Sequence, residues 1–168
     1  MPIPATTPGT PRQLLRDTVR TSLRTAIFSG AIEPGERLRD HDISAWLDAS
    51  RTPVREAIND LHRTGLIDMK PNKYTALINP TTTDGNDAIT GLHLMAQALA
   101  NTDDDLALLT DRIDPLPGNT DPAASDALAQ AVHDVGARCG STHFANALAL
   151  TLDGLLYRAR FATPTHQL

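Results

Sequence analysis

The chain has 168 residues, of which 40% are hydrophobic, and this is enough to build a packed core in one ordinary domain or two small ones. Residues 1–80 hold eleven Lys and Arg against nine Asp and Glu, whereas residues 81–168 hold four against eleven. This asymmetry indicates that only the first half meets a polyanion. The sequence shows neither a secretory signal pattern nor an apolar stretch of the roughly 20 residues that span a bilayer. We therefore expect a cytoplasmic protein with no membrane partner.

The first predicted element is a helix from Arg12 to Phe28. Residues 1–11 precede it and contain four prolines, so we expect them to form a flexible arm. Apolar residues recur every four positions along one face of the helix, at Leu15, Val19, Leu23 and Ile27. Gly30 ends the helix, and Glu33-Pro34-Gly35-Glu36 is then a tight turn, because proline presets φ and glycine tolerates a positive φ.

Two further helices are predicted in close succession. The first spans His41 to Leu47, with Asp40 as its cap and with Ile43, Trp46 and Leu47 on its apolar face. In the second, Thr52 supplies a capping hydroxyl and Pro53 occupies the first helical position. Its apolar stripe is formed by Val54, Ala57, Ile58 and Leu61, and Gly65 ends it.

A β-hairpin is expected next. Two short runs, residues 66–69 and 74–78, flank Lys70-Pro71-Asn72-Lys73, which reads as a turn. Three helices followed by a hairpin are the order of a winged helix-turn-helix, so we assign residues 12–79 to a domain of that fold.

Everything after this domain is predicted to be helical. Residues 80–86 read as a linker, and residues 87–168 as a small all-α bundle of four amphipathic helices. The predicted fold class is therefore mainly α, a winged helix-turn-helix followed by a helical bundle.

Polar side chains line the outer face of the helix that starts near Thr52. Arg51, Arg55, Asn59 and Arg63 are spaced by four residues and lie opposite the apolar stripe. A helix in the major groove needs such groups near its N-terminal end, and arginine can bind guanine O6 and N7 together. This face therefore predicts DNA binding, with a merely solvated face as the alternative.

From about Leu15 to Ile78 the sequence resembles the winged-helix domain of GntR-type regulators. The resemblance rests on Ser29-Gly30, Pro34-Gly35-Glu36-Arg37-Leu38, Ser50-Arg51-Thr52-Pro53-Val54-Arg55-Glu56-Ala57-Ile58, Leu61 and Gly65-Leu66-Ile67, all in the family's order. It implies base and phosphate contacts by Arg51, Thr52 and Arg55. It also implies that Ser50 lies at the helix entrance, and that Asn72 and Lys73 at the hairpin tip enter the minor groove. Two positions depart from the family pattern: His41 replaces a frequent arginine that contacts phosphate, and Tyr74 replaces a common wing glycine.

The second half resembles a shortened form of the helical effector and dimerisation domain called FCD. That domain usually binds a divalent metal through one Asp and three His. Here His133 aligns with one family ligand, but the usual carboxylate four residues earlier is Ala129, and the helices that carry the other two histidines are absent. We therefore expect no metal and no other cofactor, and His133 is the one candidate ligand.

The sequence predicts a transcriptional regulator that binds double-stranded DNA and is not an enzyme. We expect a repressor that binds a pseudo-palindromic operator as a homodimer through the C-terminal helices. Whether a small-molecule effector exists stays open. One alternative is a metal- or small-molecule-binding helical protein, or an enzyme, with an accessory DNA-binding domain. Another is an architectural protein that binds DNA without base discrimination.

Overall fold

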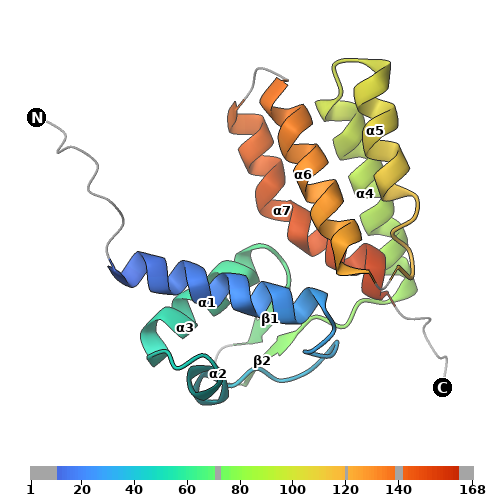
Figure 1. Ribbon diagram of the computed structural model, residues 1–168. Helices are drawn as coiled ribbons and strands as arrows, with labels where there is room; N and C mark the ends of the chain where they lie inside the picture. The colour runs from blue at the N-terminus through green and yellow to red at the C-terminus, as the bar shows by residue number, and fades with distance from the viewer. Residues whose placement is uncertain (1–10, 71–72, 120, 139–141, 163–168) are drawn as a thin grey trace, which may run out of the picture.

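A computed structural model describes residues 11–70, 73–119, 121–138 and 142–162. It has two parts: a winged helix-turn-helix made of α1, α2, α3, β1 and β2, and an upright bundle of α4 to α7, which stands above it in Figure 1. The predicted fold class is confirmed. No helix among the described residues is long and apolar enough to cross a membrane.

Helix α1 (Pro11–Phe28) packs across α3 (Arg51–Arg63). The predicted stripe of α1 is buried at Val19, Leu23 and Ile27, but Leu15 at its N-terminal end is 41% exposed. The apolar stripe predicted for α3 is buried along its whole length, from Val54 to Leu61. Gly30 and Gly65 follow α1 and α3 with φ of 77° and 76°, so both predicted helix stops are confirmed.

Two predicted helix starts are wrong by one or two residues. Helix α2 (Asp40–Trp46) is preceded by Arg39 as its N-cap, so Asp40 is the first helical residue and not the cap. Helix α3 begins at Arg51, and Ser50 is the N-cap in place of Thr52. A proline is tolerated two residues after this start, because the N–H groups of a first helical turn have no partner within the helix.

The predicted hairpin is confirmed. Strands β1 (Ile67–Lys70) and β2 (Tyr74–Leu77) pair antiparallel, with Ile67 opposite Leu77 and Lys70 opposite Tyr74. The segment before α2 joins this sheet through a bridge between Arg37 and Ala76. The segment with Arg37 follows the expected turn, in which Glu36 N donates to Glu33 O at 3.0 Å.

The bundle consists of α4 (Thr82–Leu99), α5 (Asp103–Ile113), α6 (Pro122–Arg138) and α7 (Thr142–Phe161). The predicted linker over residues 80–86 is too long, because Thr81 and Asp84 form a capping box that starts α4 at Thr82. The two parts share one continuous apolar core, which runs from α1 and α3 to α7. The ring of Phe28 at the end of α1 meets that of Tyr157 of α7 edge to face, with centroids 6.0 Å apart.

Candidate DNA-binding site

The outward face of α3 carries most of the predicted contacts. Ser50, Arg51, Thr52, Arg55 and Asn59 are all exposed, while the opposite face of the same helix packs into the core. The structure therefore brings these residues together on one surface. Arg51 and Thr52 occupy the first turn, which is the part of a helix that reaches deepest into a major groove in helix-turn-helix proteins.

The N-terminal end of α3 is open to an anion. The first turn contains no acidic residue, and the Ser50 side chain makes no capping hydrogen bond. Unpaired N–H groups and the helix dipole give this end a partial positive charge, which favours a phosphate oxygen.

Arg55 is held by an acidic residue of the preceding helix. Its Nε donates to Oδ2 of Asp40 at 2.5 Å, and the Arg55 side chain is 67% exposed. This ion pair joins α2 to α3 across the turn of the helix-turn-helix. This pair was not predicted from the sequence, in which Asp40 was interpreted as a helix cap.

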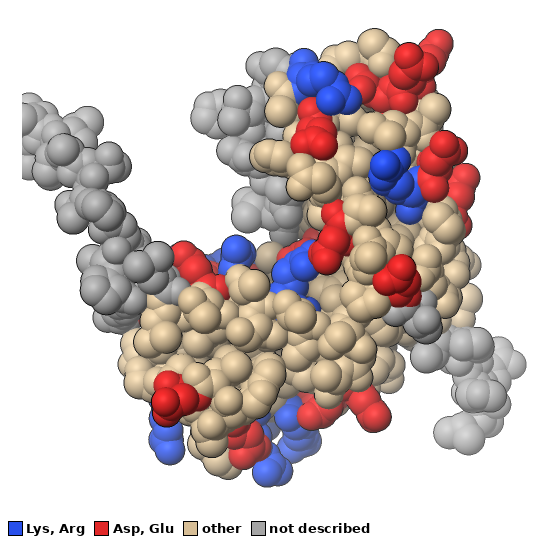
Figure 2. All heavy atoms as spheres, in the orientation of Figure 1, with Lys and Arg blue, Asp and Glu red and all other residues tan. Residues whose placement is uncertain are grey.

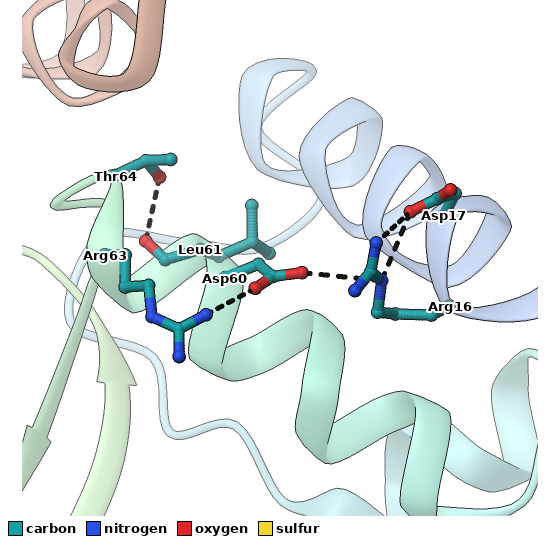
Figure 3. Close-up of polar contacts among 6 residues, drawn as sticks. All are labelled: Arg16, Asp17, Asp60, Leu61, Arg63 and Thr64. Carbon is teal, nitrogen blue, oxygen red and sulfur yellow. Dashed lines mark hydrogen bonds and ion pairs between the residues drawn. The ribbon is translucent and has the colours of Figure 1, made fainter. Parts of the chain in front are cut away.

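Figure 3 shows that the C-terminal half of α3 is tied to α1 by a second acidic residue. Asp60 lies between two arginines: Arg63 Nη1 is 2.9 Å from its Oδ1, and Arg16 Nε is 3.6 Å from its Oδ2. Arg63 is exposed as predicted, but Asp60 balances its charge. Arg51, in the first turn of α3, has no ion-pair partner among the described residues.

Helix α2 and the segment before it add a histidine and two arginines. His41 is exposed, with Nε2 3.0 Å from Oδ1 of Asp42. Arg37 and Arg39 are exposed and have no ion-pair partner among the residues described by the structure. Neither arginine was predicted as a contact from the sequence, although Arg39 lies two residues and Arg37 four residues before the predicted helix start at His41.

The wing is only partly described. Lys73 is exposed beside its tip, whereas Asn72 lies outside the described residues. The hydroxyl of Tyr74 donates to Oδ2 of Asp68 across the strands at 2.6 Å, and Lys70 Nζ lies 5.5 Å from the centroid of the Tyr74 ring. Tyr74 therefore packs within the wing and braces the two strands.

Figure 2 shows where these charges lie on one face of the molecule. Blue side chains project from the lower edge of the winged helix-turn-helix, beneath α2 and the strands, with red ones between them. A surface of this kind offers cations to a phosphate backbone without a uniform positive field.

His133, the candidate metal ligand, lies in the bundle. His133 is exposed on α6, and no group of three or more His, Cys, Asp or Glu in the described part of the chain could hold a metal ion. Among the described residues, His133 therefore belongs to no group of three or more such side chains.

Three helices, a two-stranded wing and an outward polar face on the third helix define a winged helix-turn-helix DNA-binding protein. Two solved structures share the fold. E. coli McbR/YncC is 24% identical, with 87% of this chain and 72% of that chain covered and a TM-score of 0.54. A protein described as a GntR transcriptional regulator from Rhodococcus sp. RHA1 is 23% identical, with 84% and 72% covered and a TM-score of 0.58. A comparison with curated proteins found no match.

The family is given by the sequence of the first part. Residues 15–76 match the family described as "Bacterial regulatory proteins, gntR family". This part of the chain therefore has the sequence of a GntR-family DNA-binding domain.

Proposed function

We propose that the protein is a repressor that binds a pseudo-palindromic operator as a homodimer, with α3 as the recognition helix in the major groove. The observation that carries this proposal is the division of α3 into two faces. Val54, Ala57 and Ile58 are at most 2% exposed, whereas Arg51 and Arg55 point to solvent on the other side. An arginine that the core does not need is available for a guanine edge.

The remaining contacts follow from the same placement. Thr52 and Asn59 extend the base-reading surface along α3, and Ser50 stands at the end that is open to phosphate. His41 in α2 and Arg39 just before that helix supply phosphate contacts, which position the domain without reading sequence. Lys73, and Asn72 beyond the described residues, are assigned to the minor groove.

Pairing of two copies is part of the proposal. One winged helix reads only a few base pairs, and a two-fold dimer doubles the contacts on a palindromic site. We assign pairing to the bundle, which we propose is a shortened FCD-like domain. Leu94 of α4 supports this assignment, because it is a large apolar side chain that the bundle leaves 60% exposed.

The test is selection of binding sites from randomised double-stranded DNA with the full chain, followed by affinity measurements on the selected site. Arg51→Ala and Arg55→Ala should each weaken specific binding by about tenfold to a hundredfold, since a bidentate contact to guanine discriminates by about 1 to 3 kcal/mol. Circular dichroism should show an unchanged fold, because neither side chain packs in the core.

Arg112→Ala is the matched control. This arginine lies on α5 in the bundle, where its Nη1 donates to Leu108 O, and its loss should leave DNA affinity unchanged. Wild-type affinity for the selected site in both α3 variants would refute the assignment of the recognition helix. Selection of no sequence at all, with a steep dependence of affinity on salt, would favour the architectural alternative.

A further inference from the structure

Asp40 and Arg55 meet at the centre of the proposed reading surface. Asp40 opens α2, Arg55 lies in the N-terminal half of α3, and their ion pair is 2.5 Å long. The Asp40 side chain is 29% exposed, so its carboxylate is partly screened from water and directly faces the guanidinium.

The carboxylate of Asp40 has no capping task in the helix that it begins. Arg39 occupies the N-cap position, and no side chain caps this end of α2. Among the described residues, the side chain that donates a hydrogen bond to the Asp40 carboxylate is Arg55. Asp40 thus lies in the first turn of α2, where a negative charge favours the helix, and its hydrogen bond is directed to Arg55.

We infer that Asp40 is a positioning residue that sets the base specificity of Arg55, an inference that rests on the proposed DNA-binding function. Arg55 is bound through Nε, and its Nη1 and Nη2 donors have no partner among the described residues. These two donors can bind guanine O6 and N7 together when the guanidinium is held in one orientation. A guanidinium that is already held in one orientation loses less conformational freedom on binding than a mobile one.

The Asp40 carboxylate also weakens binding to DNA that lacks the specific site. A negative charge beside the base contact is repelled by phosphates, and this repulsion weakens binding to every sequence. On the correct site, the oriented guanidinium offsets the repulsion through its bond to guanine. Asp40 therefore increases the ratio of specific to non-specific affinity and does not increase affinity in general.

Asp40→Asn tests this inference, because it removes the charge and keeps the shape. Affinities are measured by fluorescence anisotropy at one fixed salt concentration. The DNAs are the selected site, the same site with each guanine replaced in turn, and random-sequence DNA. We expect the specific to non-specific ratio to fall about tenfold, with affinity for random DNA unchanged or higher.

Asp42→Asn is the matched control for charge. Asp42 is on the same helix, is exposed and lies against His41, whose proposed contact is to phosphate. This variant removes an equal charge near the DNA and should keep the wild-type ratio. An equal fall of the ratio in both variants would overturn the inference, because a general charge effect would then explain it.

A double-mutant cycle separates positioning from a structural role. If Asp40 acts through Arg55, then Asp40→Asn should cost no discrimination in an Arg55→Ala background. A further loss in that background would overturn the inference while leaving the proposed function in place. A wild-type protein that selects no DNA sequence would instead overturn the proposed function, and the inference with it.

Discussion

Arg158 of α7 donates a hydrogen bond from Nη1 to the carbonyl oxygen of Gly65, just beyond the end of α3, at 3.1 Å. The same nitrogen donates to Gly154 O at 3.0 Å. One guanidinium thus satisfies carbonyls of both the DNA-binding domain and the bundle. Helix α3 is therefore anchored to the last helix of the bundle at the end opposite its base-reading turn.

Gly154→Ala should weaken this junction. A Cβ at Gly154 would clash with the carbonyl oxygen of Thr64, so the backbone of α7 or of Thr64 would have to move. Overpacking of this kind typically costs about 1 to 3 kcal/mol, more than the gain of about 1 kcal/mol that alanine brings to a helix. We expect a lower midpoint in urea unfolding followed by far-UV circular dichroism.

Gly91→Ala in α4 is the control for this prediction. Its Cβ would lie 3.5 Å from Leu155 Cδ2, an ordinary contact, so the variant should be stabilised by up to about 1 kcal/mol. Equal stabilisation in the two variants would contradict the close approach of α7 to the end of α3.

Tyr157→Phe should preserve or raise stability. Tyr157 is fully buried, and its hydroxyl has no hydrogen-bond partner among the described residues. Removal of an unpartnered buried hydroxyl relieves a desolvation cost of about 1 to 3 kcal/mol, and the ring contacts with Phe28 and Phe161 remain. Tyr74→Phe is the comparison, because it removes a hydrogen bond to Asp68 and should lower stability by about 1 kcal/mol.

The Tyr157 variant also has an expected pH signature. Burial raises the pKa of Tyr157, so the phenol ionises more readily in the unfolded chain than in the folded one. The wild-type free energy of unfolding should therefore fall as pH rises above about 10, the ordinary tyrosine pKa. Urea unfolding between neutral pH and this range should show a smaller fall in Tyr157→Phe; an identical pH dependence would contradict the burial of this phenol.

The predictions from sequence succeeded where the fold depends on local pattern. The periodicity of α1 and α3, the turn at Gly35 and the hairpin are set by residues close together in the chain, and all are confirmed. The same holds for the outward face of α3, because a helix places residues spaced by four on one side. The exposure of Arg51 and Arg55 could therefore be predicted without a structure.

The predictions of burial were wrong where contacts between distant segments determine which apolar side chains are covered. Trp46 was expected to pack on the apolar face of α2, yet it is 55% exposed. A helix of only seven residues buries a narrow strip, and Ile43 occupies it. Leu15 is exposed for a related reason, since the described core ends at Val19.

The ion pairs between distant residues could not be predicted from the sequence either. Asp40 and Arg55 are 15 positions apart, and Arg24 pairs with Asp153 at a separation of 129. No periodicity relates such positions, so a sequence shows the charges but not which of them cancel. The distinction between Arg55, which has a partner, and Arg51, which has none among the described residues, comes only from the packed helices.

Thr81→Ala should destabilise the start of α4. Thr81 Oγ1 accepts from Asp84 N at 3.2 Å, and Asp84 Oδ2 accepts from Thr81 N at 2.8 Å. Loss of an N-cap hydroxyl costs about 1 kcal/mol. Thermal unfolding at neutral pH measures this change, with Thr83→Ala, an exposed residue in the first turn of the same helix, as the control expected to change little.

Protonation of Asp84 at low pH should weaken the same capping box. The hydrogen bonds from Thr81 lower the pKa of Asp84, so its stabilising effect is present above the ordinary aspartate pKa of about 3.9 and is lost as pH falls through the folded value. The stability of Thr81→Ala should therefore depend less on pH below about 4 than that of the wild type. The backbone N–H of residue 81 still donates to Asp84 in this variant, so parallel curves for the two proteins would show that the Thr81 hydroxyl does not hold the Asp84 carboxylate.

Leu94→Lys should separate the proposed dimer into monomers. Leu94 is 60% exposed on α4, and a two-fold axis would bring the same residue from both copies to one interface. Burial of a leucine side chain contributes about 1.5 to 3 kcal/mol, so a lysine in its place should weaken association by about tenfold or more. Light scattering after size-exclusion chromatography measures the mass. Leu15→Lys on α1 is the control, because this leucine is also exposed but lies outside the bundle, and a dimer that persists in Leu94→Lys would place the interface elsewhere.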